Sequence, residues 1–97
     1  MKIKIPFDFD RNVTDFLQKA GYAYVQDYNA TQQSFSRRLS GGRYPRFHIY
    51  INEIDNQQEI DLHLDQKAPS YAGSSAHSGE YDGPAVESEI ERIKAMF

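Results

Sequence analysis

Apolar and polar residues alternate at the start of the chain, and this alternation predicts a half-buried strand. The apolar positions are Ile3, Ile5, Phe7 and Phe9, and the polar side carries Lys2, Lys4, Pro6 and Asp8. Pro6 lacks the N–H that a sheet ladder needs, so we expect this strand to lie at a sheet edge or to end early.

Two segments have the spacing of amphipathic helices. Asn12 can cap the first helix and Gly21 can end it with a left-handed residue. Its apolar positions are Val13, Phe16, Leu17 and Ala20. The second helix is expected to open at Asp82-Gly83-Pro84, with proline near the first helical position. Its stripe is formed by Val86, Ile90, Ile93 and Phe97.

Residues 22–28 and 33–39 read as strands, and a hairpin over 46–52 and 59–65, around a polar turn at 55–58, is the clearest unit. Its apolar residues must share the buried face: Phe47, Ile49, Ile51, Ile60, Leu62 and Leu64. Paired residue numbers then sum to an odd value such as 111 or 113. The first sum puts His48 opposite His63, and the second puts it opposite Asp65.

The order is therefore β-α-β-β-β-β-α, and we expect one α+β domain over residues 1–97. In this fold an antiparallel sheet carries both helices on one face, and residues 66–83 form a long loop. The length of 97 residues suits one domain, and no apolar stretch reaches the roughly 18 residues of a membrane span. We expect a soluble, cytoplasmic protein. With no cysteine, disulfides and thiolate zinc sites are excluded.

The net charge of −3 conceals a strong asymmetry along the chain. Residues 33–46 contain no acid and four bases, namely Arg37, Arg38, Arg43 and Arg46. Residues 47–66 contain no base and five acids, namely Glu53, Asp55, Glu59, Asp61 and Asp65. An acidic protein of this kind is unsuited to coating DNA in general, but a local anion site is compatible with the arginine block.

The polar face of the hairpin gathers residues that carry chemistry, and the third histidine, His77, stands in the 66–83 loop that could fold across its rim. The face carries Arg46, His48, Tyr50, His63, Asp65 and Lys67. A solvated sheet face with cross-strand ion pairs is the simpler interpretation. The alternative, which we favour, is an exposed functional face with both histidines turned to the solvent.

The leading functional prediction is binding of a phosphate-bearing partner, most plausibly RNA, without a cofactor. Arginines supply bidentate donors, and tyrosines supply stacking surfaces. The predicted binding residues are Arg37, Arg38, Arg43, Tyr44, Arg46, Tyr50, Asp65 and His77. The competing interpretation of this segment is a charged turn that balances the acidic hairpin.

Three further functions remain open. A metal-free ribonuclease would use His48 and His63 for proton transfer, with Lys67 or Arg46 stabilising the developing charge. A divalent-metal site could be built from His48, His63, His77 and Asp65. A protein-interaction module would use the tyrosine-rich surface.

Three stretches resemble a family of small uncharacterised bacterial proteins, for which the resemblance implies no activity. They are Arg46 to Ile51, Leu62 to Lys67 and Ala76 to Gly83. The chain also resembles mRNA-interferase toxins of double-stranded-RNA-binding-like fold, in its Gly21-Tyr22 pair after the first helix and a strand histidine, here His48. That resemblance implies RNA cleavage by His48. The chain departs from it by an N-terminal strand, a fourth sheet strand and the 66–83 loop.

Overall fold

The structure, a computed structural model, describes residues 1–27, 31–66, 79–80 and 82–97. The strands are β1 (Lys2–Lys4), β2 (Ala23–Val25), β3 (Ser34–Arg38), β4 (Arg46–Ile54), β5 (Gln57–Asp65) and β6 (Gly79–Glu80). The helices are α1 (Val13–Lys19) and α2 (Pro84–Lys94). The predicted class, an α+β protein with an antiparallel sheet and two helices, is confirmed, and β6 is an additional short strand.

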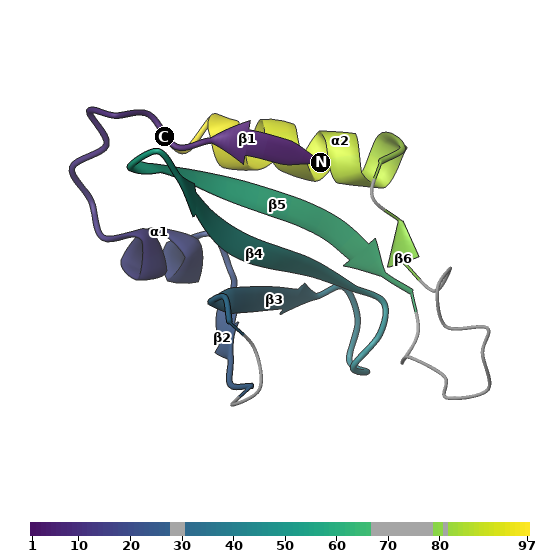
Figure 1. The fold of residues 1–97 in the computed structure, drawn as a ribbon. Coiled ribbons are helices and arrows are strands. Elements are labelled where there is room, and N and C mark those ends of the chain that lie inside the picture. The colour runs from purple at the N-terminus through teal and green to yellow at the C-terminus, as the bar shows by residue number, and fades with distance from the viewer. Residues whose placement is uncertain (28–30, 67–78, 81) are drawn as a thin grey trace.

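The sheet has the order β1-β5-β4-β3-β2, with every neighbouring pair antiparallel (Figure 1). The strand β6 pairs with the last residues of β5, beyond the segment that β1 covers. The long hairpin β4–β5 therefore occupies the middle of the sheet, and shorter strands flank it on both sides.

The hairpin turns at Asp55 and Asn56, which both adopt positive φ angles, of 53° and 65°. Two central residues of this kind form a type I′ turn, whose twist matches the flanking strands and which Asp and Asn tolerate well. Because the turn is this short, the strands extend to Ile54 and Gln57 rather than ending at 52 and 59. In the resulting register the numbers of paired residues add to 111, so that Ile49 lies opposite Leu62.

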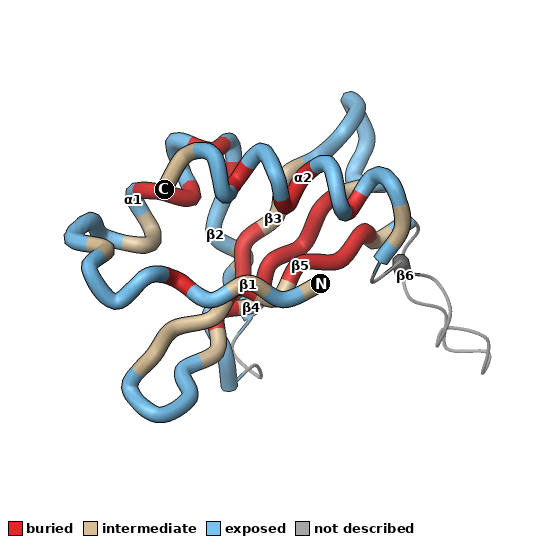
Figure 2. The backbone as a smooth tube through the Cα atoms, turned by 90° about the horizontal axis from the view of Figure 1, so that it is seen from above, coloured by how far each residue is buried: buried red, intermediate tan, exposed pale blue. Residues whose placement is uncertain are grey.

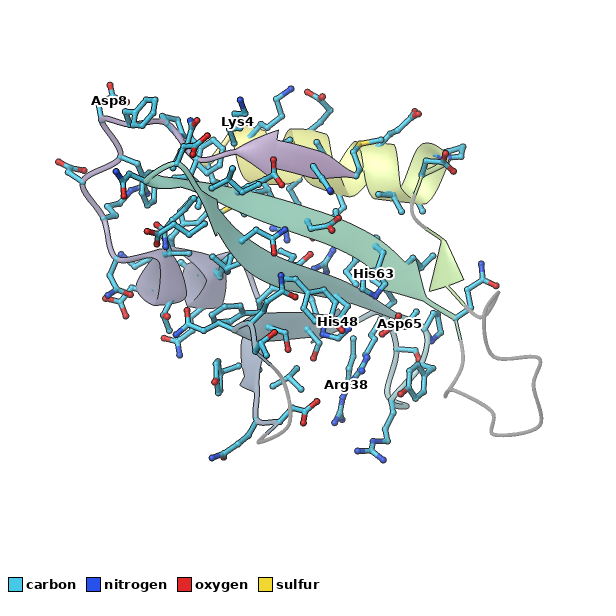
Figure 3. All side chains as sticks on the ribbon, in the orientation of Figure 1. Lys4, Asp8, Arg38, His48, His63 and Asp65 are labelled. Carbon is cyan, nitrogen blue, oxygen red and sulfur yellow. The ribbon has the colours of Figure 1, made fainter. Side chains whose placement is uncertain are left out.

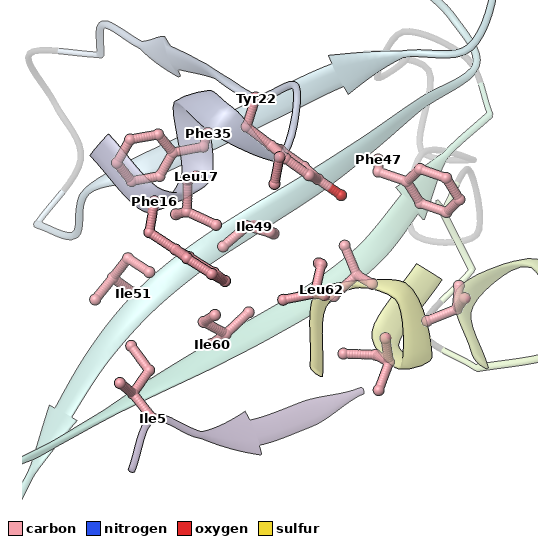
Figure 4. Packing of buried hydrophobic residues seen from close by; sticks show 14 of the residues in the cluster. Ile5, Phe16, Leu17, Tyr22, Phe35, Phe47, Ile49, Ile51, Ile60 and Leu62 are labelled. Atoms are coloured by element: carbon pink, nitrogen blue, oxygen red, sulfur yellow. The ribbon is translucent and has the colours of Figure 1, made fainter. Parts of the chain in front are cut away.

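One apolar cluster joins the inner face of the sheet to both helices (Figures 2 and 4). All six apolar hairpin residues named above are buried in it. Phe16 and Leu17 enter from α1, and Val86, Ile90 and Ile93 enter from α2. The same alternation sends the polar hairpin residues to the other side, which we call the polar face.

Both helices begin where the sequence predicts. The Asn12 side chain accepts a hydrogen bond from the Asp15 backbone N–H at 3.1 Å, and Pro84 occupies the first turn of α2. Gly21 has a φ of 100°, and a Cβ atom there would lie 2.9 Å from the Arg37 side chain. Glycine is therefore required both by the backbone angle and by the close packing.

The first strand is shorter than the alternation predicts. It ends at Lys4, and Ile5 is still buried, but Phe7 is 80% exposed. The prediction that Phe7 lies on the buried side was wrong. Pro6 cannot donate to the ladder, and the chain turns after it, so the two-residue period no longer decides which side faces the core.

A buried carboxylate ties α2 to the sheet. Glu89 is 3% exposed and lies among apolar residues of the α2 stripe. Its oxygens accept hydrogen bonds from the Tyr22 hydroxyl at 2.6 Å, from Arg37 at 3.1 and 3.2 Å, and from Arg92 at 2.8 and 2.9 Å. Arg92 also donates to the Ala20 carbonyl at 2.7 Å, beyond the end of α1.

The pKa values of this network follow from its contacts. Burial alone would raise the pKa of Glu89, but the bonds from Arg92, Tyr22 and Arg37 outweigh it and lower the pKa to about 2. Burial and the neighbouring carboxylate raise the pKa of Tyr22, so its hydroxyl stays protonated and donates. A buried charge is tolerated here because every partner is in place.

Replacing Glu89 by Gln should destabilise the protein by about 2–3 kcal/mol, because two guanidinium groups lose their shared carboxylate. We place the value below the range for fully buried pairs because Arg37 and Arg92 are 30% and 40% exposed. Urea unfolding measures the change. Glu87→Gln, at an exposed position of the same helix, is the control and should shift stability by less than about 0.5 kcal/mol. Equal losses of stability in Glu89→Gln and Glu87→Gln would contradict the role assigned to Glu89.

The stabilisation of the folded state by Glu89 should be lost in acid. A carboxyl whose pKa falls on folding stabilises the native state above its unfolded pKa, and the stabilisation is lost as the pH falls through the folded value. The stability difference between the wild type and Glu89→Gln should therefore be full above pH 4.5 and shrink toward pH 2. Urea unfolding of both proteins across this range tests it, and a difference that stays constant would refute the account.

Candidate functional site

Two histidines and an aspartate meet on the polar face, where β4 begins and β5 ends (Figure 3). His48 is the direct cross-strand partner of His63, and Asp65 follows His63 by two residues on the same face. The Asp65 Oδ2 atom lies 3.1 Å from His48 Nδ1, and its Oδ1 atom lies 2.8 Å from His63 Nε2. The imidazole rings lie 5.0 Å apart between centroids. The carboxylate thus bridges the two imidazoles.

The imidazoles are buried, although the sequence predicts an exposed face. His48 and His63 are each only 6% exposed. Tyr50 contributes to this, because its ring lies 4.5 Å from that of His48 and 5.6 Å from that of His63. The expectation of solvent-exposed histidines was therefore wrong. Alternation fixes the side of the sheet on which a residue lies, but ring packing on that side decides how much water reaches it.

Asp65 is the electrostatic centre of the cluster. Burial by itself would raise its pKa, but hydrogen bonds from His48 and His63, the charge of His63 and a bond from Arg46 together hold the pKa well below its usual range. Arg46 is the direct cross-strand partner of Asp65, and its Nε donates to Oδ2 at 3.2 Å. The carboxylate is therefore ionised, and both imidazole nitrogens that face it act as donors.

The hydrogen bonds leave one atom unmatched. His48 Nε2 is buried and has no hydrogen-bond partner within the part of the chain that the structure describes. In a neutral ring with the proton on Nδ1, Nε2 is a bare acceptor. Buried polar atoms in native proteins are nearly always paired, so hydrogen bonding alone does not account for the burial of this ring.

An arginine cluster lies beside the carboxylate. Arg38 is the direct cross-strand partner of Arg46, whose guanidinium lies 5.0 Å from the centroid of the half-buried Tyr44 ring. Arg38 and Arg43 are exposed, and neither has a side-chain partner within the part of the chain that the structure describes. We call Arg38, Arg43, Tyr44 and Arg46 the arginine rim.

Arg37 does not belong to this rim. It faces Phe47 in the β3–β4 register, on the side of the helices, with its guanidinium 5.4 Å from the Phe47 ring. Its guanidinium group forms an ion pair with Glu89. The prediction that groups Arg37 with the other three arginines is corrected here, because adjacent residues of a strand point to opposite faces.

Glu89 is the residue that sequence reasoning missed. The signal was available, because position 89 falls three residues after Val86 and one before Ile90, within the apolar stripe. A charge at such a position needs a buried partner. Two other predicted site residues, His77 and Lys67, lie outside the described residues.

Comparisons with known proteins add no assignment: no family model matches the chain, and no curated protein or solved structure matches it. Among the described residues, no helix is long and apolar enough to cross a membrane.

The geometry predicts a definite tautomer for each ring. In the EDTA-treated protein, when each ring carries a single proton, that proton should reside on Nδ1 of His48 and on Nε2 of His63, because these atoms donate to the ionised Asp65. Two-bond ¹⁵N–¹H correlation spectra of the imidazoles distinguish the tautomers. Finding His48 with its proton on Nε2 would contradict the arrangement described here.

Proposed function

We propose that the polar face binds a phosphate-bearing ligand, most plausibly single-stranded RNA, through the arginine rim. The observation that carries the proposal is the direct pairing of Arg38 with Arg46. Like charges at directly opposed positions of two strands are destabilising. An anion between them would convert this repulsion into binding energy.

Among the side chains that the structure describes, the carboxylate that contacts this pair is already committed. Asp65 accepts from both histidines and from Arg46, so it does not neutralise Arg38. Arg43 adds a further exposed guanidinium without a described partner. Planar guanidinium groups bind phosphate oxygens in a bidentate manner, and their excess here favours an anionic ligand.

The aromatic residues favour RNA over a small phosphate. Tyr44 lies in the rim and Tyr50 lies next to His48 on the same face, both half-buried. Single-stranded nucleic acids bind where cationic groups follow the backbone and aromatic rings stack on the bases. An extended strand crossing the sheet could use both features.

Binding without cleavage fits this geometry better than the ribonuclease alternative. A general acid or base must reach the proton that it transfers. The His48 and His63 side chains are each only 8% exposed, and they serve here to hold Asp65, which in turn orients Arg46.

The double variant Arg38→Gln, Arg43→Gln tests the proposal by fluorescence anisotropy with a labelled single-stranded RNA. Loss of two phosphate contacts should reduce the slope of log K against log salt by about 1.4 and the affinity by about 25-fold at 0.1 M salt. Lys2→Gln, Lys4→Gln removes the same charge from the same face, opposite Asp61 and Glu59, and should change binding by less than about threefold.

Three further measurements accompany the titration. The variant Arg38→Gln alone should be as stable as the wild type or slightly more stable, because the like-charge pair is relieved. A matched DNA strand and a mononucleotide, used as competitors, separate RNA recognition from general phosphate binding. Gel analysis should find the RNA intact; cleavage would favour the ribonuclease alternative. No RNA binding by the wild type, or equal losses in both double variants, would overturn the proposal.

A further inference from the structure

The two histidines and Asp65 also have the arrangement of a candidate metal-binding cluster. One donor atom from each of His48, His63 and Asp65 lies within 4.8 Å of the other two. Each imidazole presents one nitrogen to the carboxylate, at 3.1 and 2.8 Å. Around a tetrahedral ion whose bonds to nitrogen and oxygen measure about 2.0–2.2 Å, ligand atoms lie about 3.3–3.6 Å apart. This range lies between the 2.8 Å contact and the 4.8 Å limit of the cluster, so small side-chain adjustments would admit an ion.

The chemistry of the donor set is selective. Two imidazole nitrogens and one carboxylate oxygen suit zinc and its neighbours among divalent transition metals, whereas Mg²⁺ and Ca²⁺ prefer oxygen ligands alone. Three protein ligands leave a further position for water or a ligand, as in catalytic rather than structural zinc sites.

The supporting framework is rigid. Both histidines belong to the central strands, and their direct pairing is fixed by nine register pairs between β4 and β5. Asp65 is held from outside by Arg46, which contacts Oδ2, while Oδ1 faces His63. A hydrogen-bonded carboxylate of this kind is usual among metal ligands, because the second partner fixes its orientation.

The hydrogen bonds within the described residues do not fully account for the burial of the His48 ring. Taking this side chain out of water to 6% exposure, with one nitrogen unmatched, costs free energy that the single bond to Asp65 does not obviously offset. A metal–nitrogen bond at Nδ1 would add binding energy to this buried ring, while Nε2 would carry the displaced proton and still have no partner among the described residues.

We propose that His48, His63 and Asp65 bind one zinc-type divalent metal ion. The proposal does not require RNA binding, since none of the three ligands belongs to the arginine rim. A bound dication would also add positive charge beside Arg46, which contacts Asp65.

The test uses the full chain, stripped with EDTA and titrated with Co²⁺ and then Zn²⁺ in the absence of RNA. We expect one ion per chain, a visible absorption spectrum typical of Co²⁺ in a four- or five-coordinate site, and displacement of Co²⁺ by Zn²⁺. His63→Ala and Asp65→Asn should each lower the affinity by at least about 100-fold, since each removes a direct ligand.

Asp61→Asn is the matched control, because Asp61 lies on the same strand and face and the substitution makes the same charge change. It should bind Co²⁺ as the wild type does. Thermal unfolding gives a second readout: Zn²⁺ should raise the midpoint of the wild type and of Asp61→Asn but not of Asp65→Asn. If His63→Ala fails to fold, the comparison of Asp65→Asn with Asp61→Asn still tests the proposed site.

Two results would overturn the proposal. One is the absence of saturable binding of either ion by the stripped wild type. The other is equal affinity of Asp65→Asn and Asp61→Asn for Co²⁺, which would mean that the ion is held elsewhere. Both results leave the RNA titration unaffected, so the two proposals stand or fall separately.

Discussion

The register of the β4–β5 hairpin is the constraint on which the rest of the structure depends. Nine consecutive antiparallel pairs, closed by the turn at Asp55 and Asn56, fix which residues share a face. One face supplies six apolar side chains to the core, and the other brings His48, His63 and Asp65 together. A shift by one residue would exchange the faces and bury the charges, so the core and the site are specified by the same pairing.

The two faces use arginine in opposite ways. Arg37 and Arg92 are bound by the buried Glu89, which connects β3, α2 and the end of α1 and leaves those charges satisfied. Arg38 and Arg46 lie directly opposite each other on the polar face, and of the two only Arg46 has a carboxylate partner among the described residues, namely Asp65. The Glu89 network is saturated and holds packed elements together, whereas the arginine rim leaves an excess of positive charge on the surface.

Burial gives the histidine cluster a character different from that of a solvated sheet face. Asp65 accepts from three side chains, and the imidazoles pack against each other and Tyr50. Such a network holds its members in fixed positions, which suits orientation of Arg46 and ligation of an ion. It suits proton exchange with a solvent-borne substrate less well, because water and substrate have little access to either ring.

The sequence by itself determined both helices, the hairpin and its odd register, because periodicity and local turn chemistry act over a few residues. It therefore placed His48, His63 and Asp65 on one face correctly. Only the tertiary structure decided that Phe7 is exposed, that Arg37 turns toward Glu89, and that the imidazoles are buried. Strand alternation already places Arg37 on the face opposite Arg38, but its pairing with Glu89 and the burial of the imidazoles depend on which distant side chains pack together.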